Sequence, residues 1–253
     1  MPKKRRTGRK AELEHLELAL CLNGVAQQEG PQRKHWSMHD LKSIRPLTPT
    51  QEDLFHAWIN GYNLCAHGSA GTGKTFLAFY LALEEVLSQR YQRIIVVRSA
   101  VTTREVGHLP GTLEEKLMQF EAPYEDILWE LMGRPSTYKD MKEAGKIEFH
   151  STSFLRGLTW DNAIVIVDEA ENLTMHEIDN VMTRLGQNTR IILTGDTKQT
   201  DLDGSKKLGK EGLSTAMQVF ENMEEFSCIE FNVHDIVRGD LVKSWIMACQ
   251  RVA

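Results

Sequence analysis

The feature that most constrains this chain is a glycine-rich octapeptide that ends in lysine and threonine. Its residues are Gly68, Ser69, Ala70, Gly71, Thr72, Gly73, Lys74 and Thr75, which match the phosphate-binding pattern G-x-x-x-x-G-K-[ST]. An apolar run, 62–66, precedes it and a segment with helical spacing, 76–87, follows it, as a strand–loop–helix unit requires. The glycines let backbone N–H groups point at phosphate oxygens, and the helix start adds a positive field. Lys74 is expected to reach the β- and γ-phosphates and Thr75 to ligate Mg²⁺, so the chain is predicted to bind a nucleoside triphosphate.

Composition excludes several classes of protein. The 253 residues suit one α/β domain with additions, and the net charge of −5 confines any nucleic-acid contact to a local basic patch. The four cysteines form no C-x-x-C pair, which argues against a zinc site or a disulfide framework and for a reducing compartment. No apolar run approaches the roughly 20 residues that span a bilayer. We therefore expect a cytoplasmic protein without a membrane partner.

The first 45 residues differ from the rest. Residues 1–10 are basic and contain no acid, which suits a disordered arm that binds nucleic acid, a nuclear signal or a solubilising tail. Leucine spacing predicts an amphipathic helix over about 11–28, which Gly30-Pro31 ends, and residues 31–46 read as a linker. The division predicted is an arm at 1–10, a helix and linker at 11–45, and a nucleotide-binding domain at 46–253.

Gln51 lies near the start of a helix predicted from Thr48-Pro49 to about Asn60. Its side chain offers one donor group and one acceptor, which match the N6/N7 edge of adenine. An exposed glutamine at a helix start is the plain alternative, and only the neighbouring phosphate loop favours adenine recognition.

The remaining pattern alternates strands with helices. Short apolar, mostly β-branched runs predict strands at 93–97, 147–150, 163–167, 190–193 and 228–233. Helical spacing predicts helices over about 112–132, 136–144, 175–185, 212–222 and 240–251. Such alternation predicts a mostly parallel sheet with helices on both faces. Ligands of such sheets bind at the carboxyl ends of the strands.

Acidic and amide side chains follow two of these strands. Asp168 and Glu169 end the apolar run 163–167, which is the Walker B pattern. Asp168 is expected to complete the Mg²⁺ shell with Thr75, and Glu169 to act as general base on the attacking water. Gln199, beyond the strand at 190–193, is a candidate to orient that water or to contact the γ-phosphate.

The order of these motifs is that of the first RecA-like domain of a superfamily 1 helicase. From about residue 46 onward the chain more closely resembles the PhoH family of P-loop ATPases, in phage or bacteria. The resemblance rests on the stretches GSAGTGKT, LPGTLEEKL, FLRG, IVIVDEAEN, TRLG, LTGDTKQ and HDIVR. Two positions depart from the family pattern: Ser99 replaces a usual proline, and Glu171 replaces a usual glutamine. The first departure loosens the proposed nucleic-acid loop, and the second leaves the role of position 171 open.

The resemblance implies a single RecA-like P-loop NTPase core that couples ATP and Mg²⁺ to single-stranded nucleic acid. The helix predicted over about 11–28 from leucine spacing would be an N-terminal helical extension of this core. RNA is favoured over DNA as the strand, and the compartment is the cytoplasm, that of the host if a phage encodes the chain. By position, Arg98, Thr152 and Arg156 correspond to strand-contacting loops, and Arg238 to an arginine near the γ-phosphate. A surface ion pair is the plain alternative for each arginine. Lys206 and Lys207, with Lys210, lie in a glycine-rich loop that suits backbone contacts.

One core supplies half of a helicase-like ATP site. We therefore expect a neighbouring subunit to supply the other half in a head-to-tail ring, six-membered by analogy, with Arg184 as a candidate arginine in trans. A GTPase is excluded because Thr197-Lys198-Gln199-Thr200 lacks the acid of the guanine motif, and the Asp-Glu pair argues against a small-molecule kinase. Two functions stay open: a motor on single strands, and an assembly or regulatory ATPase without motor activity.

Overall fold

The computed structural model describes residues 36–99, 113–155, 157–196 and 212–252. The predicted basic arm at 1–10 and helix at 11–28 lie outside these residues. None of the helices in the described ranges combines the length and the apolar character that crossing a bilayer requires.

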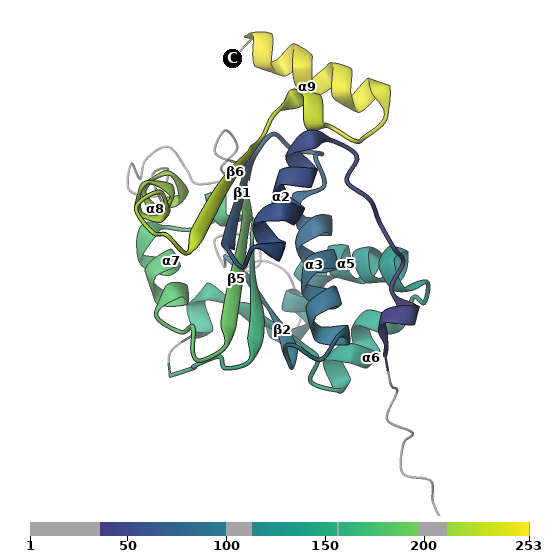
Figure 1. Cartoon of the computed structure of the whole chain (residues 1–253), viewed down its shortest axis with the longest axis vertical. Helices are drawn as coiled ribbons and strands as arrows, with labels where there is room; N and C mark the ends of the chain where they lie inside the picture. The colour runs from purple at the N-terminus through teal and green to yellow at the C-terminus, as the bar shows by residue number, and fades with distance from the viewer. Residues whose placement is uncertain (1–35, 100–112, 156, 197–211, 253) are drawn as a thin grey trace, which may run out of the picture. The chain divides into compact units, whose positions relative to one another are not determined.

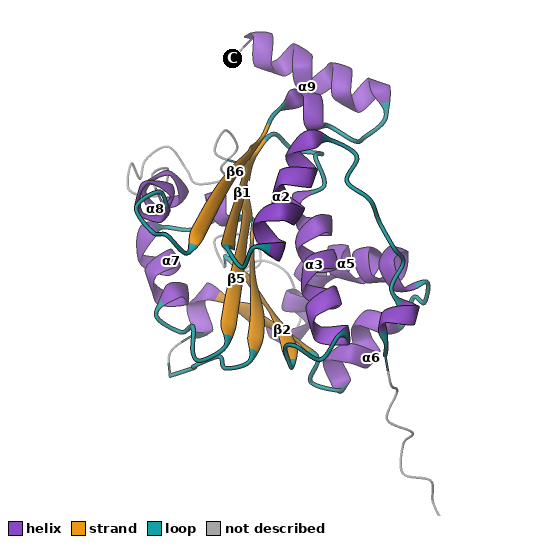
Figure 2. Ribbon diagram, in the orientation of Figure 1, coloured by secondary structure: helices purple, strands orange, loops and turns teal. Residues whose placement is uncertain are grey.

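Six parallel strands form one sheet in the order β3-β2-β4-β5-β1-β6. Figures 1 and 2 show the strands running side by side between the helices. Their bounds are β1 Asn63–Gly68, β2 Arg93–Arg98, β3 Ile147–Ser151, β4 Ala163–Asp168, β5 Thr189–Gly195 and β6 Phe226–Phe231. Strand β4 is buried at every position, and β2 is apolar and buried between its two terminal arginines, as strands covered on both faces must be. One strand, β5, separates the phosphate-loop strand β1 from β4, which is the RecA-like order and confirms the predicted fold class.

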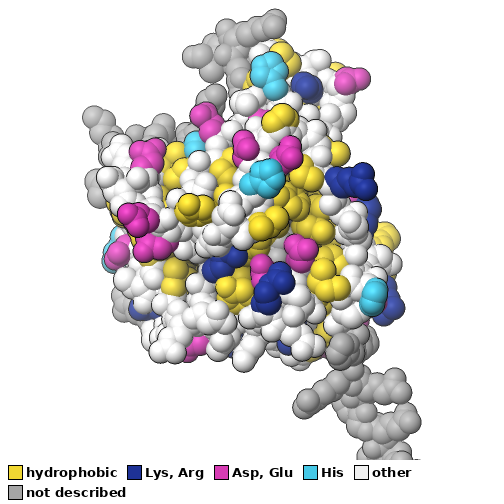
Figure 3. Space-filling view, in the orientation of Figure 1, with side chains coloured by type: hydrophobic (Ala, Val, Ile, Leu, Met, Phe, Trp, Pro, Cys, Tyr) yellow, Lys and Arg dark blue, Asp and Glu magenta, His cyan; other side chains and the backbone are white. Residues whose placement is uncertain are grey.

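Helices cover both faces of the sheet (Figure 1). Four of them pack with one apolar cluster on one face: α2 Pro49–Ile59, α3 Lys74–Leu87, α5 Leu113–Met132 and α6 Thr137–Glu143. Helices α7 Met175–Met182 and α8 Gly212–Phe220 pack with a second cluster on the other face. The chain ends in α9, Asp240–Val252, and short 3₁₀ turns follow β3, β4 and β6. On the face that α2 and α3 cover, exposed apolar side chains lie among charged ones (Figure 3).

Helix α2 is fixed to the sheet at the end remote from the phosphate loop. The guanidinium of Arg190, at the start of β5, lies 3.3 Å from the centre of the Trp58 ring and donates to the Trp58 carbonyl at 2.9 Å. The indole N–H of Trp58 donates to Glu85 of α3 at 3.0 Å. These contacts hold the helix that carries Gln51 against both the sheet and α3.

Two predicted elements end elsewhere, for local reasons. Helix α7 stops at Met182, before the predicted Leu185, because Leu185 instead forms an isolated bridge with Trp160. Strand β6 spans 226–231 where 228–233 was predicted. It ends early because the side chain of Asn232 accepts the N–H of His234 at 2.8 Å and starts a 3₁₀ turn.

Candidate nucleotide site

The phosphate loop joins β1 to α3 through left-handed backbone at three glycines. Gly68, Gly71 and Gly73 have φ values of +110°, +76° and +85°, which side chains rarely adopt. The N–H of Ser69 donates to the carbonyl of Phe231 at 2.8 Å, so β6 holds the start of the loop in place. The loop therefore has a conformation that depends both on its glycines and on the neighbouring strand.

The ammonium of Lys74 lies against its own loop. Its Nζ donates to the carbonyls of Gly68 and Ser69, each at 2.8 Å. Burial lowers the pKa of Lys74 below its usual value, while nearby carboxylates oppose that change. The geometry thus holds a cation at the loop where phosphate oxygens would be expected.

Thr75 and Asp168 meet although 93 positions separate them in the sequence. The Thr75 hydroxyl donates to Asp168 Oδ1 at 2.8 Å, and the Thr194 hydroxyl donates to the same oxygen at 2.7 Å. The Tyr124 hydroxyl, from α5, donates to Asp168 Oδ2 at 2.9 Å. Hydroxyl and carboxylate oxygens are the ligands that Mg²⁺ prefers, so the residues present fit this cation.

Sequence reasoning missed Tyr124. A tyrosine inside an amphipathic helix looks like any core aromatic, and Tyr124 is indeed fully buried. Burial and the Asp168 carboxylate raise the pKa of Tyr124 well above its usual value, so its hydroxyl remains a donor.

Glu169, the predicted general base, is held by Arg98. Arg98 Nε donates to Glu169 Oε2 at 3.0 Å, and Arg98 Nη2 donates to Glu169 Oε1. The guanidinium also lies 5.5 Å from the centre of the Phe120 ring and donates to the Phe120 carbonyl at 3.4 Å. The backbone of Glu169 is left-handed, with φ of +52°. Arg98, which the resemblance predicted to contact a nucleic-acid strand, is therefore paired with a carboxylate of the protein itself.

Gln51 is buried and in contact with the phosphate loop. Its Oε1 accepts the N–H of Leu47 at 2.8 Å, and its Nε2 donates to the carbonyl of Thr72 at 3.2 Å. The predicted adenine reader thus already uses its acceptor and one donor within the protein. The second N–H of the Gln51 amide makes no hydrogen bond to the described residues.

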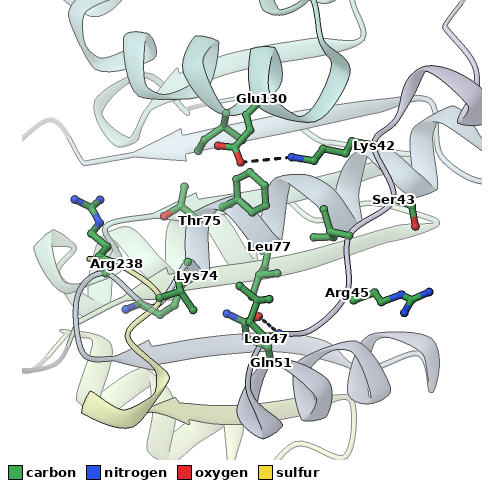
Figure 4. A pocket seen from close by; sticks show the side chains of 16 residues that line it. Lys42, Ser43, Arg45, Leu47, Gln51, Lys74, Thr75, Leu77, Glu130 and Arg238 are labelled. Carbon is green, nitrogen blue, oxygen red and sulfur yellow. Dashed lines mark hydrogen bonds and ion pairs between the residues drawn. The ribbon is translucent and has the colours of Figure 1, made fainter. Parts of the chain in front are cut away.

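Arg238, predicted to lie near the γ-phosphate, lies beside Gly71 of the phosphate loop. The N–H of Val237 donates to the carbonyl of Gly71 at 3.2 Å, and a Cβ added at Gly71 would lie 3.4 Å from Arg238 Cδ. A pocket of about 720 Å³ opens beside them, bounded by the loop, α3, α5 and the segment 42–47. Arg238, Lys74 and Thr75 border it, and Lys42 pairs with Glu130 across another part of its rim at 3.9 Å (Figure 4).

Other predicted site residues form hydrogen bonds with other parts of the fold or lie outside the residues that the structure describes. The Thr152 hydroxyl donates to Glu177 at 2.7 Å, and Arg184 Nε donates to the Leu155 carbonyl at 3.0 Å. Both side chains thus join elements of the fold. Gln199, Arg156, Lys206, Lys207 and Lys210 lie outside the described residues.

Glu171, whose role the sequence left open, lies next to the acidic pair. Its Oε2 accepts the N–H of Asp196 at 3.1 Å. Burial raises the pKa of Glu171 to about 7, and the nearby carboxylates of Glu169 and Asp168 act in the same direction.

Comparison with known proteins identifies close relatives. A family model described as PhoH-like protein matches residues 43–250. A PhoH-like protein of Synechocystis sp. is 41% identical over 185 residues, which make up 73% of this chain and 55% of that protein. Protein PhoH of Escherichia coli is 36% identical over 217 residues, 84% of this chain and 58% of that protein. The chain thus spans little more than half the length of these curated relatives.

Solved structures also match this chain, at low sequence identity and low TM-score. Pif1 helicase from Candida albicans matches 75% of this chain and 41% of its own, at 15% identity and a TM-score of 0.36. The large terminase of a thermophilic bacteriophage, in complex with ADP, matches 79% of this chain and 49% of its own, at 11% identity and a TM-score of 0.46. At these identities and scores the matches say nothing about the function of this chain.

Proposed function

The chain belongs to the PhoH-like protein family, and from that premise we propose that it hydrolyses ATP. We propose that this hydrolysis is coupled to the binding of single-stranded nucleic acid, with RNA favoured over DNA. One observation supports the proposed ATP hydrolysis. The fold brings the hydroxyl of Thr75 to within 2.8 Å of Asp168, and Lys74 and Glu169 are the sequence neighbours of these two residues. These are the groups that a phosphoryl-transfer site needs, and they meet at one edge of the sheet.

Each group has a chemical task in the proposed reaction. Backbone N–H groups of residues 68–75 and the ammonium of Lys74 bind the phosphates. Thr75 and Asp168 would hold Mg²⁺, which would supply positive charge to neutralise the phosphates. Glu169 accepts a proton from the attacking water, and Arg238 approaches the γ-phosphate. Gln51 braces the loop through the Thr72 carbonyl, and Gln199 is assigned the orientation of water.

Arg98 lies at the carboxyl end of β2, in register with Asp168. This placement supports the proposed coupling of ATP hydrolysis to a nucleic-acid strand. A cation at this edge suits the phosphates of a strand that crosses the sheet. Lys206 and Lys207 are assigned further backbone contacts, which makes strand binding dependent on salt and tolerant of sequence.

Steady-state ATP hydrolysis with and without single-stranded RNA and DNA tests the proposal. We expect turnover to rise with one strand type and to fall at least about 100-fold in Glu169→Gln, because a general base contributes that much. Hydrolysis that depends on Glu169 yet ignores both strands would refute the coupling and favour an assembly ATPase. Hydrolysis that survives in Glu169→Gln would refute the assigned chemistry.

We further propose a ring of subunits, six by family analogy. Arg238 is exposed at the pocket, so a neighbouring subunit docked head-to-tail has access to the bound phosphates. Light scattering at micromolar concentration with a non-hydrolysable ATP analogue is expected to give a mass of several subunits. A monomer under these conditions would contradict the ring.

A further inference from the structure

We propose that Arg98 is a positioning residue that withholds Glu169 from the attacking water until a phosphate of the nucleic-acid strand replaces the carboxylate. The inference rests on the proposed function and names its regulation. It makes one ion pair the link between strand binding and hydrolysis.

The ion pair engages the whole carboxylate. Both oxygens of Glu169 accept from Arg98, one from Nε and one from Nη2. The Arg98 side chain is only 15% exposed, against 39% for Glu169, and Phe120 contacts its guanidinium through both its ring and its carbonyl. A partly buried, bidentate pair of this kind holds Glu169 in one orientation.

The ion pair holds the carboxylate on the β2 side of β4. In the sheet, β4 has β2 on one side, and on the other side β5 and then the loop strand β1. Arg98 ends β2 and pairs in register with Asp168, the residue before Glu169. The ion pair therefore draws the carboxylate toward β2. A general base must lie within hydrogen-bond reach of the water it activates, so hydrolysis requires the pair to open.

A phosphodiester is the chemical group best suited to open it. Guanidinium binds phosphate oxygens with the same two-pronged geometry that it uses for a carboxylate. The next strand outward, β3, pairs Ser151 with Arg98, and the Ser151 hydroxyl is buried without a hydrogen-bond partner among the described residues. The carboxyl ends of β2 and β3 thus provide a cation and a spare hydroxyl on the side of β4 away from the loop.

The first test measures ATP hydrolysis without nucleic acid. Arg98→Gln is expected to hydrolyse ATP about fivefold faster than the wild type and to lose stimulation by the strand, because a coupling of this kind is worth about 5–150-fold. Arg93→Gln is the matched control. Arg93 is on the same strand and pairs with Glu148 at 2.9 Å, at the opposite end of β2, so its basal rate should match the wild type. An unchanged or lower basal rate in folded Arg98→Gln would overturn the inference.

The second test uses reciprocity and needs no hydrolysis. If the strand and Glu169 compete for Arg98, then Glu169→Gln must bind a fluorescent single-stranded oligonucleotide about tenfold more tightly than the wild type, without nucleotide. Glu148→Gln should bind like the wild type. Equal affinity in Glu169→Gln and the wild type would overturn this inference alone. Absence of binding by every variant would overturn the proposed strand coupling as well. A non-hydrolysable ATP analogue that tightens wild-type binding as much as Glu169→Gln would assign the release to nucleotide phosphates instead.

Discussion

Gly68→Ala is expected to abolish nucleotide binding and to lower the free energy of unfolding by about 3–5 kcal/mol. Gly68 has φ of +110°, and a Cβ built there would lie 2.1 Å from the carbonyl oxygen of Phe231. Because that oxygen belongs to the backbone of β6, no side-chain rotation relieves the overlap. The strand must move, and the hydrogen bond from the Ser69 N–H to the same carbonyl is lost with it. Urea denaturation and titration with a fluorescent ATP analogue measure the two effects.

Gly61→Ala separates the overlap from the backbone strain. Gly61 also has positive φ, +92°, but a Cβ there would meet nothing within 4 Å. We expect this variant to lose about 1–2 kcal/mol of stability, through the backbone alone, and to bind nucleotide normally. If both variants lost the same stability and both bound nucleotide, contact with β6 would not be what fixes the loop.

The fold could be predicted from the sequence wherever burial on both faces imposes a continuous apolar run. The run 163–167 became β4 within one residue, because every position of that strand is buried. Strand β6 was displaced by two residues because, at the sheet edge, its burial is mixed and polar residues interrupt it. The spacing of apolar residues and the composition thus locate central strands well and edge strands poorly.

Contacts between distant segments were predictable only where a motif specifies them. The placement of Thr75 beside Asp168 followed from two strand-end motifs in a parallel sheet. The partners of Arg98 and Gln51 did not, because a long side chain at a strand end or helix start can reach several groups and its choice depends on packing. Tyr124 gave no signal at all, since its role depends on how α5 lies over the sheet.

Glu171→Gln is expected to stabilise the protein by about 3 kcal/mol at pH 8 and by little at pH 4.5. The pKa of Glu171 is raised by burial from about 4.5 to about 7, with Glu169 and Asp168 nearby. Between pH 4.5 and about pH 7 the Glu171 carboxyl has released its proton in the unfolded chain but retains it in the folded chain. The wild type therefore loses stability as the pH rises through this range. A glutamine titrates at no pH and can still accept the N–H of Asp196. The free energy of unfolding is measured by urea denaturation from pH 4.5 to 8 without Mg²⁺ or nucleotide.

Glu125→Gln, on the exposed surface of α5, controls for loss of one negative charge and should follow the pH dependence of the wild type. Parallel curves for Glu171→Gln and the wild type would show that Glu171 ionises alike in the folded and unfolded chains. The expected divergence would instead mean that below pH 7 a protonated Glu171 acts as a neutral hydrogen-bonding group. In that state the third carboxyl, beside Asp168 and Glu169, adds no charge to the proposed Mg²⁺ site.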